Sequence, residues 1–582
     1  MTPEQKTSRF TKQKDILKHL FVYLGSAWVV IEALNFLIDK YYWNSRVLDI
    51  LILIIIFGLP SMVIYLWFDR KFTRNAVILH SVNLAIMFSV IGLTLAKPGS
   101  LDPRQIRLLK FKEDQKKLAE KVRALAVLPF SNYTGDDANA PIILGMHDAL
   151  INELGRISAI RVISKTSTLP YAQTDKSVKE IASDLKVDAI IEASVVNVDG
   201  GINITVKMIN ATPEQQLWSR TFESGREDFL GLYNRIVNDI ASQINIALSP
   251  GETAYLKANR KVNPEAHKAF LQGMYYVESL TDRGLSLAME NFTRSIALDS
   301  LYAPAYAGLA FAWIAAVQMR NVTVAEGIPE IYNNYLTAMK LDPNYPQAHY
   351  IEALMSIQGE WNWEKGEAAF KKSIAGNPNH ALSHAYYSHL LMFLRRFDKA
   401  FIELEKALSL DPNNSLIYDL YSVVLWHYGD LEQAMIMSEK AAELDPLGDK
   451  NGMDRFQESY YYQKGNLDKS MELTEMLYGD MVSDMDHVVE IYKTLGYQPA
   501  MKELATQLQD LAHLQSLMIA WFYNRAGMTE ETIYWLERGY EMHDPDMPYA
   551  FLPIEFRGLV SNPRYVALAE KMKLPLPDSS DN

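Results

Sequence analysis

Three long runs of hydrophobic residues before residue 97 dominate the pattern of hydrophobic and polar positions. The runs cover residues 20–38, 47–68 and 76–96. Each is about 20 residues long, and at about 1.5 Å per helical residue such a run crosses a hydrocarbon core about 30 Å thick. The pattern therefore predicts three transmembrane helices, with the lipid bilayer as one partner of the chain.

Two ionisable residues interrupt these runs. Glu32 lies in the first run and His80 in the third. A charge without a partner is costly at membrane depth, so each residue needs an explanation. One hypothesis is a proton-linked or signalling pair. The other, which we favour because nothing else in the sequence suggests transport, is a neutral Glu32 hydrogen-bonded inside a three-helix bundle.

Lys and Arg in the flanking segments predict the topology. The tail at residues 1–19 and the loop after the second run are basic, which places the N-terminus in the cytoplasm. Three spans in a bacterial inner membrane then put the C-terminal bulk in the periplasm. Residues 97–123 form a basic helical linker, with a helix start at Asp102 and Pro103. Their positive charge favours a cytoplasmic location for this linker, in disagreement with the three-span topology. If the first run only lies on the surface, the bulk is cytosolic.

The period of the pattern changes after residue 123. Short apolar runs alternate with segments of helical spacing in the order β-α-β-α-β-β-β-α. This order predicts a small α/β domain over residues 124–250. The predicted strands lie at residues 124–130, 160–164, 189–198, 202–210 and 216–223.

After the α/β segment, a longer repeat period appears in the sequence. Prolines preceded by Asp or Asn recur at Pro343, Pro378, Pro412 and Pro446. Their spacing of about 34 residues is typical of the tetratricopeptide repeat (TPR), a helix–turn–helix unit in which small residues let the two helices cross closely. Ala400 and Ala434 occupy such positions. We therefore predict an all-α TPR superhelix with a C-terminal cap over residues 262–572, followed by a loose tail at 573–582.

Residues 124–250 resemble the TolB amino-terminal or FlgO-like domain. The resemblance rests on residues 125–130, 131–136, 161–167 and 217–222 and on Gly145. It implies a non-catalytic binding or sensory module that precedes TPRs. Similar halves occur behind membrane spans in CadC-like regulators and some nucleotidyl cyclases, which carry an output domain at the N-terminus. Only the short tail at residues 1–19 precedes the first run here, so we expect any output domain on another polypeptide.

The TPR resemblance also implies a binding site. The first helix of each repeat typically lines a concave face that binds protein or peptide segments. The repeat register places five side chains on this face, namely Tyr350, His389, Asp419, Trp426 and His427. For Trp426 we favour ordinary packing between repeats over binding.

Composition and charge exclude several classes of function. The chain has 582 residues and no Cys, which excludes disulfides and thiolate metal sites. Its net charge of -13 argues against general nucleic-acid binding. We find no catalytic motif and no glycine cradle for phosphate, and expect no enzyme activity, cofactor or metal. The leading hypothesis is a membrane-anchored protein-binding scaffold, with homo-oligomerisation left open. The alternative is a sensory subunit that relays binding through the spans to a cytoplasmic output protein.

Overall fold

A computed structural model gives the fold of the chain. It describes residues 3–41, 46–68, 70–96, 110, 113–136, 139–198, 201–224, 229–257, 262–277, 281–319, 321–445, 451–511, 516–552 and 554–576. The predicted helix start at Asp102 and Pro103 and the repeat residue Pro446 lie outside these ranges. The chain divides into two compact units, Met1–Gln115 and Lys116–Asn582.

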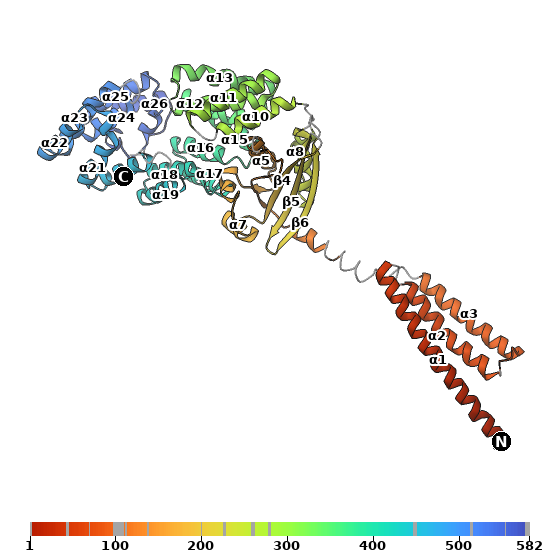
Figure 1. The fold of residues 1–582 in the computed structure, drawn as a ribbon. Helices are drawn as coiled ribbons and strands as arrows, with labels where there is room; N and C mark the ends of the chain where they lie inside the picture. Colours follow the sequence, from red (N-terminus) through yellow and green to blue (C-terminus); the bar gives the residue numbers. More distant parts are fainter. Residues whose placement is uncertain are drawn as a thin grey trace. The chain divides into compact units, whose positions relative to one another are not determined.

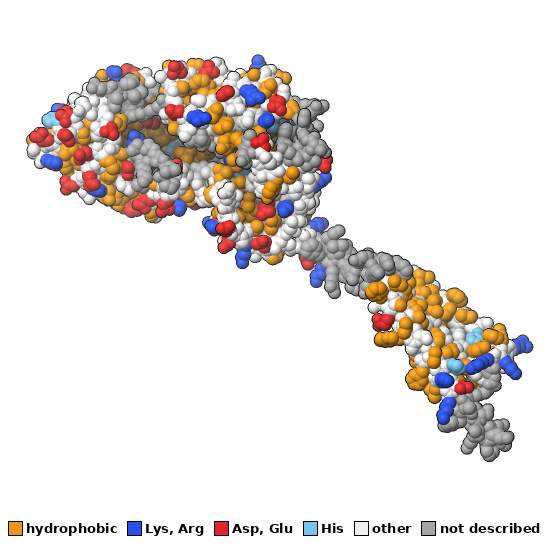
Figure 2. Space-filling view, viewed as in Figure 1, with side chains coloured by type: hydrophobic (Ala, Val, Ile, Leu, Met, Phe, Trp, Pro, Cys, Tyr) orange, Lys and Arg blue, Asp and Glu red, His pale blue; other side chains and the backbone are white. Residues whose placement is uncertain are grey.

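The first unit consists of three long helices, α1 (Pro3–Tyr41), α2 (Arg46–Trp67) and α3 (Arg74–Ala96). All three are long and apolar enough to cross a membrane. Large apolar side chains cover much of their surface (Figure 2), among them Phe21, 74% exposed, and Trp28, 66% exposed. Such a surface favours a lipid environment over water.

Hydrogen bonds between helices hold this unit together. The Tyr23 hydroxyl of α1 donates to the Ile55 carbonyl of α2 over 2.8 Å. Gly58 permits this approach, because a Cβ at Gly58 would lie 2.1 Å from the Tyr23 hydroxyl oxygen. On α3, the Asn83 amide donates to the Phe57 carbonyl over 2.7 Å and to the Ser61 hydroxyl over 2.8 Å. Each bond gives a polar side chain a partner within the unit.

The two ionisable residues predicted at membrane depth are not paired with each other. Glu32 is exposed on α1. A neutral, hydrogen-bonded Glu32 therefore stays a prediction. The His80 ring of α3 is half-buried against Phe72, with 6.3 Å between ring centroids.

The second unit begins with a mixed α/β part (Figure 1). Its elements are β1 (Ala124–Val127), β2 (Ser131–Asn132), α5 (Ala140–Gly155), β3 (Arg161–Val162), α6 (Lys165–Thr168), η2 (Leu169–Tyr171), α7 (Val178–Leu185), β4 (Ala189–Val198), β5 (Gly201–Ala211), β6 (Glu214–Ser224), α8 (Phe229–Gln243) and α9 (Pro250–Lys257). The strand order is β3-β1-β4-β5-β6, and β2 also pairs with β4. β1 is parallel to β3 and β4, whereas β4, β5 and β6 are antiparallel.

The alternation of side chains along the strands explains how the sheet is covered. One face carries Val127, Ile191 and Val206, which pack with α5 and α8 in one buried cluster. The other face carries Ala126 and Ile190, which pack with α7. The predicted order of strands and helices is confirmed, and the short β2 and the α6–η2 turns are additions to it.

Helices paired in antiparallel fashion make up the rest of the unit (Figure 1). They are α10 (Pro264–Val277), α11 (Asp282–Leu298), α12 (Ala303–Gln318), α13 (Val324–Leu341), α14 (Pro346–Leu354), α15 (Trp363–Gly376), α16 (Ala381–Phe393), α17 (Phe397–Leu410), α18 (Ser415–Tyr428), α19 (Leu431–Leu444), α20 (Asn451–Gln463), α21 (Leu467–Tyr478), α22 (Met485–Leu495), α23 (Tyr497–Gln507), α24 (Ser516–Arg525), α25 (Thr529–Glu541) and α26 (Pro563–Met572). Short turns of other helix types lie at η3 (Met355–Gly359), η4 (Gly479–Met481), η5 (Leu508–Leu511), η6 (Met547–Phe551) and η7 (Arg557–Leu559).

The small residues predicted at the helix crossings are buried. Ala400 and Ala434 have no exposed surface, nor does Ala288 in an earlier pair. The array also contains the pair α22–α23, for which the period gives no signal. The α/β part and the repeats belong to one compact unit, so the domain boundaries given above stay predictions.

Candidate functional site

The predicted binding residues lie on the first helices of three successive repeats: Tyr350 on α14, His389 on α16, and Asp419, Trp426 and His427 on α18. Local capping sets the limits of α18. The Asn414 side chain accepts a hydrogen bond from the Ile417 amide at its start, and Gly429, with φ of 105°, ends it in the left-handed conformation.

Burial divides these five side chains. Tyr350, His389 and Trp426 are at most 4% exposed, whereas His427 is half-buried and Asp419 is exposed. Tyr350 packs edge-on against His380, with 5.0 Å between ring centroids. Trp426 packs in the same way against Phe456 of α20, at 5.6 Å. Both therefore join neighbouring repeats, as we favoured for Trp426. Partner binding by any of the five stays a prediction.

A segment near the C-terminus covers part of this face. We call residues 543–556 the cover segment; residue 553 lies outside the described residues. Its Tyr549 ring meets Phe393 edge-on at 4.9 Å and lies 6.0 Å from the His427 ring. Ile554 packs in one cluster with Leu425 and Trp426. The first-helix face is thus occupied by the chain itself.

His389 is held in one neutral form beneath this segment. Its Nε2 lies 3.1 Å from the Leu420 carbonyl, which can only accept, so Nε2 carries the proton. Nδ1 then accepts from the Tyr549 hydroxyl at 3.4 Å. Burial lowers the pKa of His389 to about 4. Burial, with the neighbouring His389, lowers the pKa of His427 to about 3. Both imidazoles are neutral at pH 7.

The pKa of the Asp419 carboxyl is raised, whereas the pKa values of the two histidines are lowered. The groups packed around its carboxyl remove part of its hydration, and this desolvation, with the charge of Asp445, raises the pKa of Asp419 to about 6. The first-helix face therefore combines neutral imidazoles, aromatic rings and a weakly acidic carboxyl. Such a surface suits an uncharged or weakly polar protein segment better than a highly charged one.

A buried ionic cluster anchors the end of the cover segment. The Trp521 Nε1–H donates to a Glu555 carboxylate oxygen over 2.5 Å, and the Asn524 amide donates to the Glu555 carbonyl over 2.7 Å. The Arg525 guanidinium bonds Glu458 over 2.6 Å and lies 3.8 Å from Glu555. Sequence reasoning missed this cluster, since its members are far apart in the chain and fall in no motif.

Polar contacts between the α/β part and the repeats were also missed. The Asn379 amide donates to the Gly155 carbonyl over 2.9 Å and to the Ile160 carbonyl over 3.0 Å, and its oxygen accepts from the Val162 amide over 3.0 Å. The Ser167 hydroxyl donates to Asp411 over 2.5 Å. Residues 161–167, which support the family resemblance, therefore form part of the surface that meets the repeats.

The described residues contain no group of three or more His, Asp and Glu placed to hold a metal ion. Several histidines of the array have other contacts. His384, for example, has its Nδ1 2.5 Å from Glu403.

Comparison with known proteins gives two family matches. The family described as "HilA/YgeH-like transcriptional regulator, second domain" matches residues 120–239. The tetratricopeptide repeat family matches residues 385–414, which include most of α16 and all of α17. The repeats predicted from the recurring prolines are therefore confirmed. The TolB amino-terminal or FlgO-like assignment stays a prediction.

Individual proteins are similar over parts of the chain. "Putative adenylate cyclase 3" of Rhizobium meliloti (strain 1021) is 25% identical over 232 residues, 40% of each chain. The present chain thus spans two fifths of the length of this curated relative. Among solved structures, TTC0263, a thermophilic TPR protein of Thermus thermophilus, is 18% identical, covering 33% of this chain and 97% of that one, with a TM-score of 0.28. PilW, a type IV pilus biogenesis factor, is 12% identical, covering 38% and 98%, with a TM-score of 0.30.

Proposed function

We propose that this chain is a membrane-anchored scaffold that binds other proteins through its repeats. The observation that supports it most directly is the occupied first-helix face. There α16 and α18 already contact the cover segment through the Tyr549 ring and the Ile554 side chain. A face that packs one such segment has the shape and chemistry to pack another.

The anchor and its orientation are part of the proposal. Three apolar helices with exposed Phe and Trp side chains support insertion into a bilayer. The basic N-terminal tail supports a cytoplasmic N-terminus in a bacterial inner membrane, with the repeats in the periplasm. The cytosolic placement of the repeats stays the alternative.

The test is recovery of partners from solubilised membranes. The full chain is cross-linked in membranes, purified in mild detergent, and its partners are identified and quantified. In the variant Asp419→Arg we expect partner recovery to fall at least about fivefold, because a long cationic side chain then projects from the face. Asp398→Arg, on the exposed side of α17, is the matched control and should recover partners as the wild type does. Equal recovery with both variants would exclude this face.

A second candidate function is a sensory relay. Both the matched family and the cyclase relative are named for signalling proteins. The buried contacts of Asn379 and Ser167 also give the α/β part a direct mechanical connection to the repeats. Removing residues 3–13 should release a cytoplasmic kinase, cyclase or transcription factor if the relay operates, and should leave periplasmic partners bound if the scaffold does.

The cyclase relative also calls for a direct check of catalysis. We propose that the chain is not an enzyme, since no catalytic motif occurs in its sequence. The purified full chain, incubated with ATP and Mg²⁺ or Mn²⁺, should form no cyclic AMP above a boiled control. Turnover that scales with protein concentration would contradict the proposal.

A further inference from the structure

One end of the three-helix unit carries a cluster of basic side chains, which we call the basic end. Its members are Lys14, Lys18 and His19 on α1, Arg70 and Lys71 between α2 and α3, and Arg74 at the start of α3. They lie at or next to one end of each of the three candidate membrane spans. Figure 2 shows Lys and Arg side chains gathered at this end of the unit.

A hydrogen bond joins the first span to the loop after the second. A guanidinium can only donate, so Arg70 donates to Nε2 of His19 over 3.2 Å and keeps its full charge. The Arg70 backbone, with φ of 61°, ends α2 through a bond from its amide to the Tyr65 carbonyl over 3.0 Å. The loop therefore holds Arg70 against α1, with its other donors directed to no protein acceptor among the described residues.

The positive charge of the basic end is not neutralised within the described part of the unit. There, no Asp or Glu side chain is bonded to Lys18, Arg70, Lys71 or Arg74, and all four are exposed. Residues 14–19 and 69–74 contain five Lys and Arg against two Asp, so the excess charge is positive. An anion from outside the chain would be attracted to this end.

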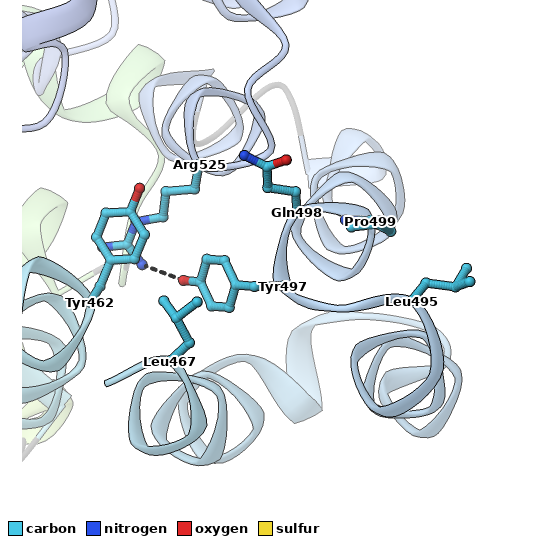
Figure 3. A pocket seen from close by; sticks show the side chains of 7 residues that line it. All are labelled: Tyr462, Leu467, Leu495, Tyr497, Gln498, Pro499 and Arg525. Atoms are coloured by element: carbon cyan, nitrogen blue, oxygen red, sulfur yellow. Dashed lines mark hydrogen bonds between the residues drawn. The ribbon is translucent and has the colours of Figure 1, made fainter. Parts of the chain in front are cut away.

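A cation in the repeats shows the opposite situation. Arg525 borders a pocket together with Tyr462 and Tyr497 (Figure 3). Its side chain has no exposed surface and donates to Glu458 over 2.6 Å and to the Tyr497 hydroxyl over 3.4 Å. That charge is neutralised inside the protein, whereas the charge of the basic end is accessible to a ligand.

An apolar surface begins directly beside the basic end. Trp67, the last residue of α2, is 56% exposed, and Phe72 in the following loop is 73% exposed. The Phe72 ring lies 5.6 Å from the Tyr65 ring of α2. Aromatic side chains at such a boundary are typical of the headgroup level of a bilayer. Cations and apolar side chains thus lie side by side, as the phosphate and acyl chains do in a phospholipid.

We infer that the basic end binds an anionic phospholipid, with the exposed guanidinium groups of Arg70 and Arg74 at its phosphate and its acyl chains along Trp67 and Phe72. The inference rests on the proposed insertion of α1, α2 and α3 into a bilayer and adds a ligand at a defined place. A guanidinium binds phosphate oxygens through two parallel N–H groups. A zwitterionic headgroup also carries an ammonium, which these cations repel, so the site favours an anionic lipid.

Native mass spectrometry of the full chain in detergent tests the inference. The chain is mixed with phosphatidylglycerol or with phosphatidylcholine of the same acyl chains, and the bound lipid is quantified. Arg70→Gln combined with Arg74→Gln is the test variant. Lys6→Gln combined with Arg9→Gln is the control, because it removes the same charge from a stretch of α1 about 15–20 Å beyond His19.

We expect the wild type and the control to bind phosphatidylglycerol at least about tenfold more tightly than phosphatidylcholine, because several cations attract the anionic headgroup together. The test variant should keep a preference of about twofold or less. A wild-type chain without preference, or equal preference in the test variant and the control, would overturn the inference.

A second variant covers the case in which loss of the bond between Arg70 and His19 loosens the unit. Lys18→Gln combined with Lys71→Gln removes two charges and breaks no hydrogen bond or ion pair among the described residues. We expect it to lower the preference for phosphatidylglycerol by about threefold or more. An unchanged preference would contradict the proposed site.

Glycerol 3-phosphate distinguishes a lipid site from a site for soluble phosphate. It carries a phosphate but no acyl chains to contact Trp67 and Phe72, so in large excess it should leave bound phosphatidylglycerol in place. Displacement of the lipid would assign the site to a soluble phosphate and overturn the inference.

Carbonate extraction of membranes separates this inference from the proposed anchor. If the chain stays in the membrane fraction at high pH but shows no preference for phosphatidylglycerol, the anchor stands and the headgroup site is wrong. If carbonate releases the chain, the anchor fails and the headgroup site fails with it.

Discussion

Asn379 connects the repeats to the α/β part through one buried side chain. It satisfies the Gly155 carbonyl at the end of α5, and the Ile160 carbonyl and the Val162 amide in the loop and strand that follow. These three backbone groups are inaccessible to water in the folded chain. Loss of their common partner would therefore leave each of them unsatisfied.

We predict that Asn379→Ala lowers the free energy of unfolding by about 1–3 kcal/mol, the cost of leaving buried polar groups without partners. Urea denaturation of the full chain in detergent, followed by circular dichroism, measures the change. Asn333→Ala, on the exposed side of α13, is the control and should change the free energy by less than about 0.5 kcal/mol. Equal midpoints for the two variants would contradict the assigned role.

His389 and His427 make stability depend on pH. Their folded pKa values of about 4 and about 3 lie below the unfolded value of 6.5, so between these limits the unfolded chain binds more protons. Stability is therefore lost as pH falls from 6.5 toward 4, by up to about 1.4 kcal/mol per pH unit for each group. We expect His389→Gln to reduce this slope between pH 6.5 and 5, measured from urea midpoints. His487→Gln, on the exposed side of α22, should keep it.

At the scale of elements, the cover segment determines what the first-helix face can do. Its Tyr549 lies against Phe393 and His427, and Glu555 fixes its end through Trp521 and Asn524. The Tyr565 hydroxyl of α26 also donates to the Ala550 carbonyl over 2.6 Å, so α26 holds the segment from the other side.

We predict that Tyr549→Ala opens the face and destabilises the chain by about 2–3 kcal/mol through loss of aromatic packing. Hydrogen–deuterium exchange should become faster in α16 and α18, and recovery of partners should rise if the face binds them. Tyr534→Ala, at a tyrosine 51% exposed on α25, is the control and should change neither measurement. Unchanged exchange in α16 and α18 would show that the segment does not cover the face.

Local sequence patterns predicted the helices and strands, but they did not predict the contacts between elements that are distant in sequence. The apolar runs, the alternation along β5 and the spacing of Ala400 and Ala434 each depend on neighbours in sequence, so the helices, the sheet and the repeats could be predicted. The cover segment could not, because its contacts with His389 join residues 160 positions apart. The register placed His389 and His427 on the right helices, but it gave no sign that the chain itself would cover them.

At the scale of the whole molecule, the orientation in the membrane is the prediction with the widest consequence. A reporter that is active only outside the cytosol, fused after residue 576, should give signal, because the proposed orientation, with three spans and a basic N-terminal tail, puts the repeats outside. The same reporter fused within residues 70–73, between α2 and α3, should be silent. The reverse pattern would support the cytosolic alternative.

The cover segment also determines how tightly a partner protein must bind in order to displace it from the first-helix face. A tethered segment never dilutes away, so an incoming partner competes with a rival at a fixed, high effective concentration. Each increment of about 1.4 kcal/mol by which closure of the face is favoured weakens the apparent affinity of that partner tenfold. Scarce or freely diffusing proteins would then be ignored. The chain would respond mainly to partners concentrated in the same membrane, where their high local concentration offsets the high effective concentration of the tethered segment.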